Sequence, residues 1–257
     1  MSDHLLPDAQ RLSRRVAAQL SCSRSEAENY ILGGWVRVDG VLLEEPMARV
    51  RTDQVVEVHP QARPEPLTPV TLIWHKPANR VLPQEPLLPD ALAAKWFKAD
   101  LRCASDRTGL RMLKAHLHRL QPVAPLAHTA SGLMVYTQNP AVARKLNDTA
   151  HPVEHEWLVE VADAAVLAEQ AGRDAVLQSL SQALFFNGWA LPKAQASWQS
   201  EQRLRLAIKG DCPGQVEHLV MRAGLKPKAV RRLRLGRVAL AGLAVGEWRY
   251  LLPTVRF

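Results

Sequence analysis

Hydrophobic and polar positions near the start of the chain predict a small module of helices followed by a hairpin. Ser23 followed by Glu26 is the pattern of a capping box, in which a hydroxyl and a carboxylate bind free amides at the start of a helix. Gly33 and Gly34 predict the end of that helix. Asp39-Gly40 between two apolar runs then predicts a tight hairpin, and residues 55–58 predict a third strand.

The rest of the chain alternates strand-like and helix-like segments. Runs rich in branched and aromatic residues predict strands at residues 71–74, 133–137, 157–161 and 204–208. Leucines at positions 110, 113, 117 and 120 have helical spacing and predict a helix over residues 110–120. We therefore expect an α+β domain built on a mixed sheet with flanking helices.

A proline-rich stretch separates these two regions. Pro64, Pro66 and Pro69 interrupt any helix and withhold backbone donors from a sheet. We expect a small N-terminal domain at residues 1–60, a linker at 61–69 and a larger domain at 70–257.

Composition limits the class of protein. The chain has 257 residues, of which 47% are hydrophobic and 23% are charged, so each region can bury a core. No apolar run approaches the roughly 20 residues of a membrane-spanning helix, and the first residues lack the pattern of a secretory signal. Three widely spaced cysteines cannot form a disulfide framework. We expect a cytoplasmic monomer that does not bind membranes.

Positive charge is concentrated near the C-terminus. The net charge is +8, and residues 203–257 hold 12 Lys or Arg against three Asp or Glu. Such a density attracts a polyanion through counterion release, which favours nucleic acid as the partner, although a solvated basic surface remains the alternative. Six cations fall within one stretch of twelve residues: Lys226, Lys228, Arg231, Arg232, Arg234 and Arg237.

Residues 11–58 resemble an S4 RNA-binding domain. The similarity rests on Ser23-Arg24-Ser25-Glu26-Ala27, on Val36-Arg37-Val38-Asp39-Gly40 and on Asp53-Gln54-Val55. The resemblance implies that arginines of this module contact folded RNA through its shape and phosphates, and the candidates are Arg14, Arg15, Arg24 and Arg37. A protein-contact role stays open, because residues 1–60 carry 7 Lys or Arg against 9 Asp or Glu.

Over almost its whole length the chain resembles the S4-bearing bacterial rRNA pseudouridine synthases of the RsuA/RluF type. Matching motifs are Lys76-Pro77, Ser131-Gly132-Leu133 and Gly246-Glu247-Trp248-Arg249. The resemblance implies a pseudouridine-synthase-like domain, structured ribosomal RNA as partner, a role in rRNA processing, and an isomerase reaction that needs no cofactor. No metal site is expected, since His116 and His118 point to different sides of a helix.

The catalytic motif itself is degenerate. The family has Arg-Leu-Asp-x-x-Thr-x-Gly-Leu, and alignment on Ser131-Gly132-Leu133 places Pro125 at the arginine and Ala127 at the aspartate. A methyl group has no lone pair, so it can act neither as a nucleophile nor as a base. We expect no isomerase activity by the usual mechanism.

Neighbouring positions have changed as well. The resemblance assigns the uracil pocket to His155, Trp157 and Gln215, with His155 and Trp157 replacing a lysine and a tyrosine of the family. The cations that the family places in the last motif have become Gly214, Glu217 and His218. From these losses we expect that no cation remains to support a carboxylate at position 127.

A second aspartate leaves an alternative open. Asp106 also precedes a Gly-Leu pair, but the leucine spacing that follows predicts a helix, so we expect Asp106 at a helix N-terminus. If Asp106 instead replaces the missing acid, the protein is a divergent active synthase that converts uridine to pseudouridine. The other hypotheses are an RNA-binding protein without isomerase activity and a purely protein-binding relative.

Overall fold

The computed structural model describes residues 8–162, 167, 169–182, 185, 186, 188–190 and 193–257. Contacts divide the chain into two compact units. One comprises the chain up to Pro69 together with Arg111–His118, and the other comprises Val70–Leu110 and Arg119–Phe257.

Two helices and two small sheets make up the N-terminal unit. The helices are α1 (Leu12–Leu20) and α2 (Arg24–Leu32). One sheet has the strand order β3-β2-β5 and the other pairs β1 with β4. Their bounds are β1 (Ala9–Arg11), β2 (Val36–Val38), β3 (Val41–Leu42), β4 (Arg49–Arg51) and β5 (Val56–Val58).

The local signals of this unit are confirmed. Ser23 caps α2 through the Glu26 amide, and the Glu26 carboxylate binds the Ser23 amide in return. Asp39 and Gly40 form the tight turn between β2 and β3 with φ values of 50° and 77°, as a two-residue hairpin requires. Leu12, Val16, Ile31 and other apolar residues of these elements form a buried core.

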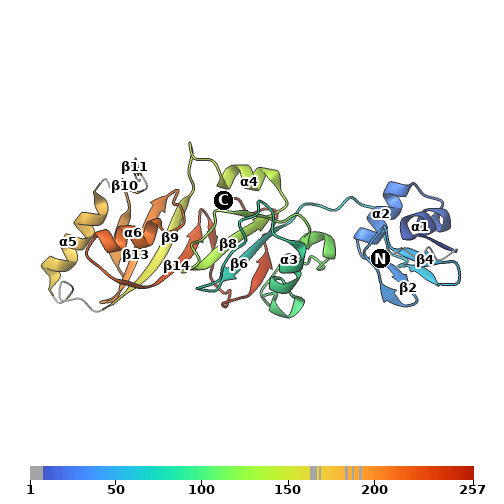
Figure 1. The fold of residues 1–257 in the computed structure, drawn as a ribbon, viewed down its shortest axis with the longest axis horizontal. Coiled ribbons are helices and arrows are strands. Elements are labelled where there is room, and N and C mark those ends of the chain that lie inside the picture. The colour runs from blue at the N-terminus through green and yellow to red at the C-terminus, as the bar shows by residue number, and fades with distance from the viewer. Residues whose placement is uncertain (1–7, 163–166, 168, 183–184, 187, 191–192) are drawn as a thin grey trace, which may run out of the picture. The chain divides into compact units, whose positions relative to one another are not determined.

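The second unit is built on a mixed sheet of nine described strands, shown in Figure 1. Its main order is β12-β13-β9-β14-β8-β6-β16, with β15 beside β14 and β7 beside β8. The strands are β6 (Thr71–Lys76), β7 (Gln121–Val123), β8 (Ser131–Thr137), β9 (Glu154–Val161), β12 (Gln195–Trp198), β13 (Arg203–Lys209), β14 (Pro227–Leu235), β15 (Val238–Ala239) and β16 (Trp248–Tyr250). Each strand predicted in this region is confirmed, and so is the α+β class.

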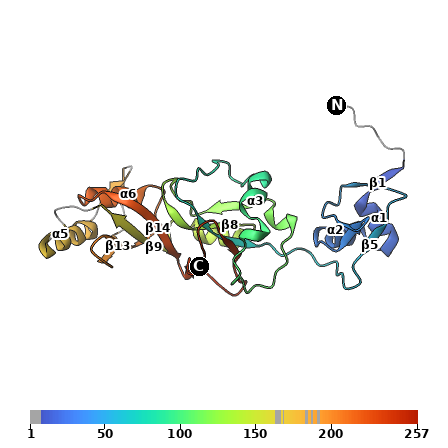
Figure 2. The same ribbon diagram turned by 90° about the horizontal axis from the view of Figure 1, so that it is seen from below.

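Helices and short segments complete this unit. The helix α6 (Gln215–Arg222) packs against β14, and Figures 1 and 2 show it beside the sheet. The remaining elements are α3 (Asp90–Trp96), the 3-10 turn η1 (Ala99–Leu101), α4 (Pro140–Leu146), α5 (Gln170–Ser181) and the hairpin strands β10 (Phe185–Phe186) and β11 (Trp189–Ala190).

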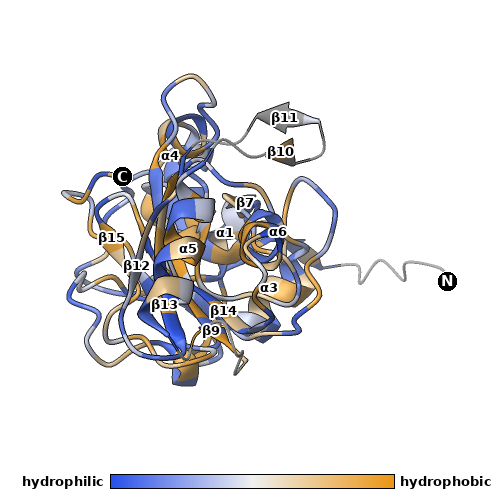
Figure 3. Cartoon of the chain, turned by 90° about the vertical axis from the view of Figure 1, so that its left-hand side faces the viewer, coloured by the Kyte–Doolittle hydropathy of each residue, from blue (hydrophilic) through white to orange (hydrophobic). Residues whose placement is uncertain are grey.

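The sheet separates an aromatic cluster from an aliphatic one. The rings of Trp74 and Trp96 stack with centroids 5.0 Å apart, and Phe97 packs edge-on against Tyr136. Ile73, the neighbour of Trp74 in β6, belongs instead to the aliphatic core. Along β13 exposed cations alternate with buried leucines, and the hydrophilic positions of this strand are visible in blue in Figure 3.

The predicted helix over residues 110–120 is wrong. Only the 3-10 turn η2 (Lys114–Leu117) forms there, and the backbone reverses at Arg119, whose φ is 54°. Leu113, Leu117 and Leu120 are nevertheless buried, so burial rather than helix geometry accounts for their pattern. Asp106 therefore does not begin a helix.

Among the described residues, no helix is both long and apolar enough to span a bilayer. The same residues contain no group of three side chains arranged to hold a metal ion.

Candidate functional site

The residues that the sequence aligns with the family's catalytic motif lie in the loop at residues 124–130, between β7 and β8. Lys76, at the end of β6, is fully buried beneath it. Its Nζ donates hydrogen bonds to the carbonyl oxygens of Ala130 at 2.7 Å, His128 at 2.9 Å and Pro77 at 3.1 Å. Burial lowers the pKa of Lys76 to about 8, partly opposed by the charge of Glu217. Lys76 thus holds the loop backbone on both sides of residue 129.

Arg232 on β14 holds the start of the same loop. Its Nη2 donates to the carbonyl of Ala124 at 2.5 Å, and its Nε donates to that of Leu133 at 2.8 Å. The residue is 1% exposed, and this burial lowers its pKa to about 9. Two buried cations therefore bind the backbone around Ala127. The expectation that no cation remains beside this position is wrong.

Gly132 explains why a glycine stands in this motif. Strands β8 and β14 run parallel here, with Gly132 opposite Arg232. The φ of Gly132 is +111°, and a Cβ at this position would lie 2.3 Å from the carbonyl oxygen of Arg232. Only a residue without a side chain permits this approach of the two strands.

The loop supplies no carboxylate of its own. Ala127 is partly exposed, and residues 125–130 read Pro, Leu, Ala, His, Thr, Ala. A carboxylate reaches the loop from α6 instead, because Thr129 Oγ1 donates to Glu217 Oε1 at 3.3 Å. From the sequence alone, Glu217 is identified only as a residue that replaces a cation of the family, and its contact with the loop is not predicted.

The three residues assigned to the uracil pocket are all buried. His155 and Trp157 lie two positions apart on β9, so they point to the same side of the sheet. A hydrogen bond links His155 Nδ1 to Asp211, and burial together with the charge of Arg232 lowers the pKa of His155 to about 3. Gln215 Oε1 accepts from the Cys212 amide. Contact of these residues with uracil stays a prediction.

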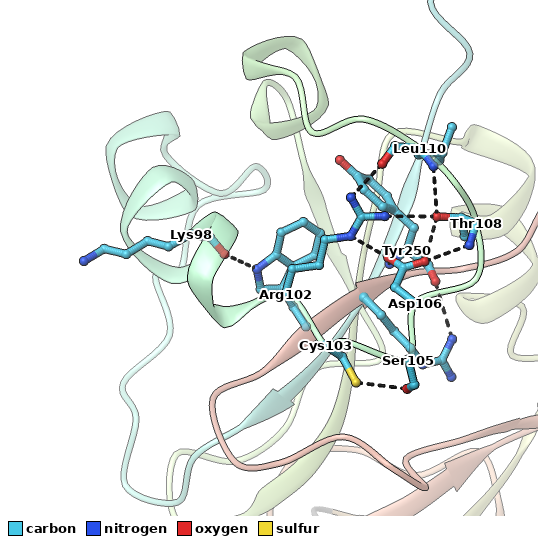
Figure 4. A network of polar contacts seen from close by, with 10 residues as sticks. Lys98, Arg102, Cys103, Ser105, Asp106, Thr108, Leu110 and Tyr250 are labelled. Atoms are coloured by element: carbon cyan, nitrogen blue, oxygen red, sulfur yellow. Dashed lines mark hydrogen bonds and ion pairs between the residues drawn. The ribbon is translucent and has the colours of Figure 1, made fainter.

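Asp106 lies in a separate, saturated network, drawn in Figure 4. Its Oδ1 accepts from the amide and hydroxyl of Thr108 at 2.9 and 2.7 Å. Its Oδ2 accepts from Arg102 Nε at 2.8 Å and from the Tyr250 amide at 3.1 Å. Burial alone would raise the pKa of Asp106, but these hydrogen bonds outweigh it and hold the pKa below its usual value.

The position of Asp106 also separates it from the loop. It binds the amide of Tyr250, which is paired with Leu72 on β6, whereas Lys76 at the loop lies four residues farther along that strand. At about 3.3 Å per residue the two places are roughly 13 Å apart along β6. Asp106 is therefore a structural anchor of residues 102–110, and it does not share a site with Ala127.

The cations predicted to meet RNA near the C-terminus fall into three groups. Lys226, Lys228, Arg231 and Arg237 are exposed. Arg234 is held by Glu154 and Glu156, each at 2.7 Å. Arg232 is buried, so its guanidinium is not part of the exposed basic surface. The prediction that Arg232 belongs to an exposed RNA-binding surface is therefore wrong, and Arg234 is an ion-paired residue and not a free cation.

The arginines of the N-terminal unit are more accessible. Arg14, Arg24 and Arg37 are exposed, and Arg15 is partly exposed. Arg24 forms an ion pair with Glu28 at 2.9 Å, and Arg37 donates to the carbonyl of Gly40 at 2.7 Å. Surface pairs of this kind are weak and exchange readily for a phosphate. The contacts of these arginines with RNA stay predictions.

Comparison with solved structures supports the fold. A crystal structure of a pseudouridylate synthase superposes with a TM-score of 0.53 and 18% identity, and the match covers 94% of this chain and 95% of that one. The second unit therefore has the mixed-sheet fold of that class of enzyme.

Sequence relatives point the same way. The chain is 24% identical over 250 residues to the dual-specificity RNA pseudouridine synthase RluF of Escherichia coli (strain K12), covering 96% of this chain and 77% of the relative. The corresponding protein of Shigella flexneri is 23% identical over the same shares. No family model matches. The chain is thus a homologue of RluF.

Proposed function

We propose that this protein binds structured RNA, with ribosomal RNA as the partner, and does not isomerise uridine. The proposal rests on Ala127, which the resemblance aligns with the essential aspartate of the RsuA/RluF-type enzymes and which lies in a loop, residues 124–130, without any carboxylate. Similarity to RluF over 96% of the chain supports RNA as the partner.

The chemistry of the loop supports binding without catalysis. Isomerisation requires a lone pair, supplied by an ionised carboxylate acting as nucleophile or base. Lys76 and Arg232 hold the loop in place through backbone carbonyls, but as protonated groups they only donate hydrogen bonds. The loop is thus held in place by two cations and carries no carboxylate that could act on uridine.

Exposed cations in both units bind the phosphates of the RNA. In the N-terminal unit, which resembles an S4 domain, these are Arg14, Arg15, Arg24 and Arg37. In the second unit they are Lys226, Lys228, Arg231 and Arg237. All eight are at least partly exposed, and cations at the surface bind phosphates by releasing counterions from the RNA.

A second candidate function is a divergent active synthase, and Glu217 is the observation that favours it. Its carboxylate contacts Thr129, two residues from Ala127. Asp106, the acid first considered for this role, has both oxygens occupied elsewhere.

Incubation of the full chain with unmodified ribosomal RNA distinguishes these functions. Pseudouridine is mapped by carbodiimide modification and primer extension, and RNA retention is measured by gel shift at physiological salt. We expect retained RNA and no new pseudouridine. New pseudouridine that is lost in Glu217→Gln but kept in Glu201→Gln, an exposed control, would establish the active synthase. Absence of any retained RNA would favour the protein-contact alternative.

A further inference from the structure

Three buried side chains of the second unit have hydrogen-bond donors without acceptors. Trp157, Gln215 and Arg232 are 3%, 2% and 1% exposed. Trp157 Nε1 and Gln215 Nε2 have no partner among the described residues. Buried polar groups are nearly always bonded to protein, to water or to a ligand. Two such orphan donors call for an acceptor.

Arg232 adds unused donors and an unbalanced charge. A guanidinium has five N–H groups, and Arg232 uses two of its nitrogens, on the carbonyls of Leu133 and Ala124. No carboxylate pairs with it anywhere in the described parts of the chain. Buried arginines are normally paired with an anion, and the family's loop carboxylate is absent here.

Arg232 and Trp157 are direct neighbours, and Gln215 begins the helix that packs against the strand of Arg232. The Cζ of Arg232 lies 5.5 Å from the centroid of the Trp157 ring, and the two residues are register partners across β14 and β9. His155, on the same side of β9, binds Asp211 in the turn that leads into α6. Gln215 is the first residue of α6, and this helix packs against β14, the strand that carries Arg232.

The donor pattern does not match uracil. The pairing edge of uracil has two carbonyl acceptors on either side of an N–H donor, and that donor needs an acceptor from the protein. Gln215 Oε1 is already bound by the Cys212 amide, and Asp211 is engaged with His155. The remaining groups of Trp157, Gln215 and Arg232 only donate.

An oxyanion has the complementary chemistry, since its oxygens only accept and its charge balances the guanidinium. We propose that Trp157, Gln215 and Arg232 form a buried binding site for an oxyanion, either a small carboxylate or a phosphate group. The proposal does not depend on RNA binding or on loss of isomerase activity.

The indole N–H signals of the ¹⁵N-labelled full chain provide the test. The Trp157 signal is identified by its loss in Trp157→Phe, which keeps an aromatic ring. Sodium formate, inorganic phosphate, uridine 5′-monophosphate and uridine are added separately at ionic strength matched with sodium chloride. We expect formate or phosphate to shift the Trp157 signal saturably and uridine to leave it unchanged. If uridine 5′-monophosphate binds more tightly than inorganic phosphate, the natural ligand is the phosphate group of a nucleotide.

Internal and matched controls make the outcome specific. The Trp248 indole, which already donates to the Lys98 carbonyl at 2.8 Å, should not move. Gln215→Glu keeps the acceptor for Cys212 and replaces the amide donor by a negative oxygen. This change should lower the affinity for the anion at least tenfold. Gln178→Glu adds the same charge on the exposed surface of α5 and should have no effect. An unmoved Trp157 signal, an equal response to uridine, or wild-type binding by Gln215→Glu would overturn the proposal.

Discussion

Gly132 lies where β8 leaves no room for a side chain against β14. In Gly132→Ala the new methyl would lie 2.3 Å from one backbone oxygen and 2.6 Å from a backbone nitrogen of Arg232, at a φ of +111°. Neither atom can move without separating β14 from β8. We expect a loss of about 3 kcal/mol or more in unfolding free energy, measured by urea denaturation.

Gly109→Ala is the matched control for this change. Gly109 also has a positive φ, +68°, but a Cβ there meets nothing within 4 Å. We expect it to lose only about 1 kcal/mol, from backbone strain alone. Equal losses for the two variants would show that the close approach to β14 is unimportant.

Ala127→Asp tests the two buried cations of the loop. With Lys76 and Arg232 bound to the backbone around position 127, the new carboxyl group should have a lowered pKa. A carboxylate of this kind stabilises the fold above its unfolded-state pKa of about 3.9, and the benefit is lost as pH falls through the folded-state pKa. We expect Ala127→Asp to be about 1–2 kcal/mol more stable than Ala127→Asn at pH 7, and equal to it near pH 2.

The opposite pH dependence would contradict this account. A carboxyl group without a nearby cation would have a raised pKa, so Ala127→Asp would be the less stable variant at pH 7 and would recover on acidification. We also expect Ala127→Asp to make no pseudouridine, because the resemblance aligns Trp157 with a tyrosine that contacts uracil, and an indole only donates.

Adjacent cations of one charged run have different fates. The density of charge at residues 226–237 is visible in the sequence, but Arg231 is exposed, Arg232 is buried and Arg234 is ion-paired. These fates depend on pairing with β8 and β9, which are distant in sequence. Reading the run as a strand would have given one useful signal, since Arg232 falls on the same side as the buried Val230.

Among the elements, the segment 102–110 is held to β16 by the Asp106 carboxylate and by the Cys103 amide, which donates to the Trp248 carbonyl. Asp106→Asn would remove the ion pair with Arg102 while keeping the shape of the side chain. We expect a loss of about 3 kcal/mol at pH 7, because Arg102 keeps its charge in a largely buried place. The pKa of Asp106 is lowered in the fold, so the advantage of the wild type should disappear as pH falls below about 4.

Asp100→Asn is the control for Asp106→Asn. Asp100 is exposed, and we expect its replacement to change the free energy of unfolding by less than about 0.5 kcal/mol at any pH. A similar small effect for Asp106→Asn would show that the network in Figure 4 does not anchor the segment.

Elements with strong local signals could be predicted, and elements decided by long-range contacts could not. The capping box of α2 and the turn at Asp39 and Gly40 need only their own residues. The leucines at 113, 117 and 120 imitate a helix because an irregular segment buries them one by one. The short pair β1 and β4 gave no periodic signal, since each strand has only three residues.

For the whole molecule, affinity for RNA should depend steeply on salt. Replacing Lys226, Lys228, Arg231 and Arg237 together by glutamine removes four exposed cations. We expect the slope of log affinity against log salt to flatten by roughly three units, at somewhat under one unit per lost phosphate contact. The measurement is a gel-shift or fluorescence titration with ribosomal RNA at several salt concentrations.

A second quadruple variant controls for net charge. Arg63, Lys95, Arg107 and Arg119 are also exposed but lie outside the basic run. Their replacement by glutamine should change the slope by less than one unit. If both variants flatten the slope equally, the binding reflects the overall charge of the protein rather than a defined surface.

The parallel contact between β14 and β8 has a consequence for how the chain folds. It joins Ser131 to Arg231, across a long separation in sequence, whereas the antiparallel contacts on either side can form within shorter stretches. Loop closure makes such distant pairings slow. We expect this contact to form after the transition state, so that Gly132→Ala speeds unfolding and leaves the refolding rate nearly unchanged in stopped-flow urea jumps. A refolding rate that falls in proportion to the lost stability would instead place the contact in the folding nucleus.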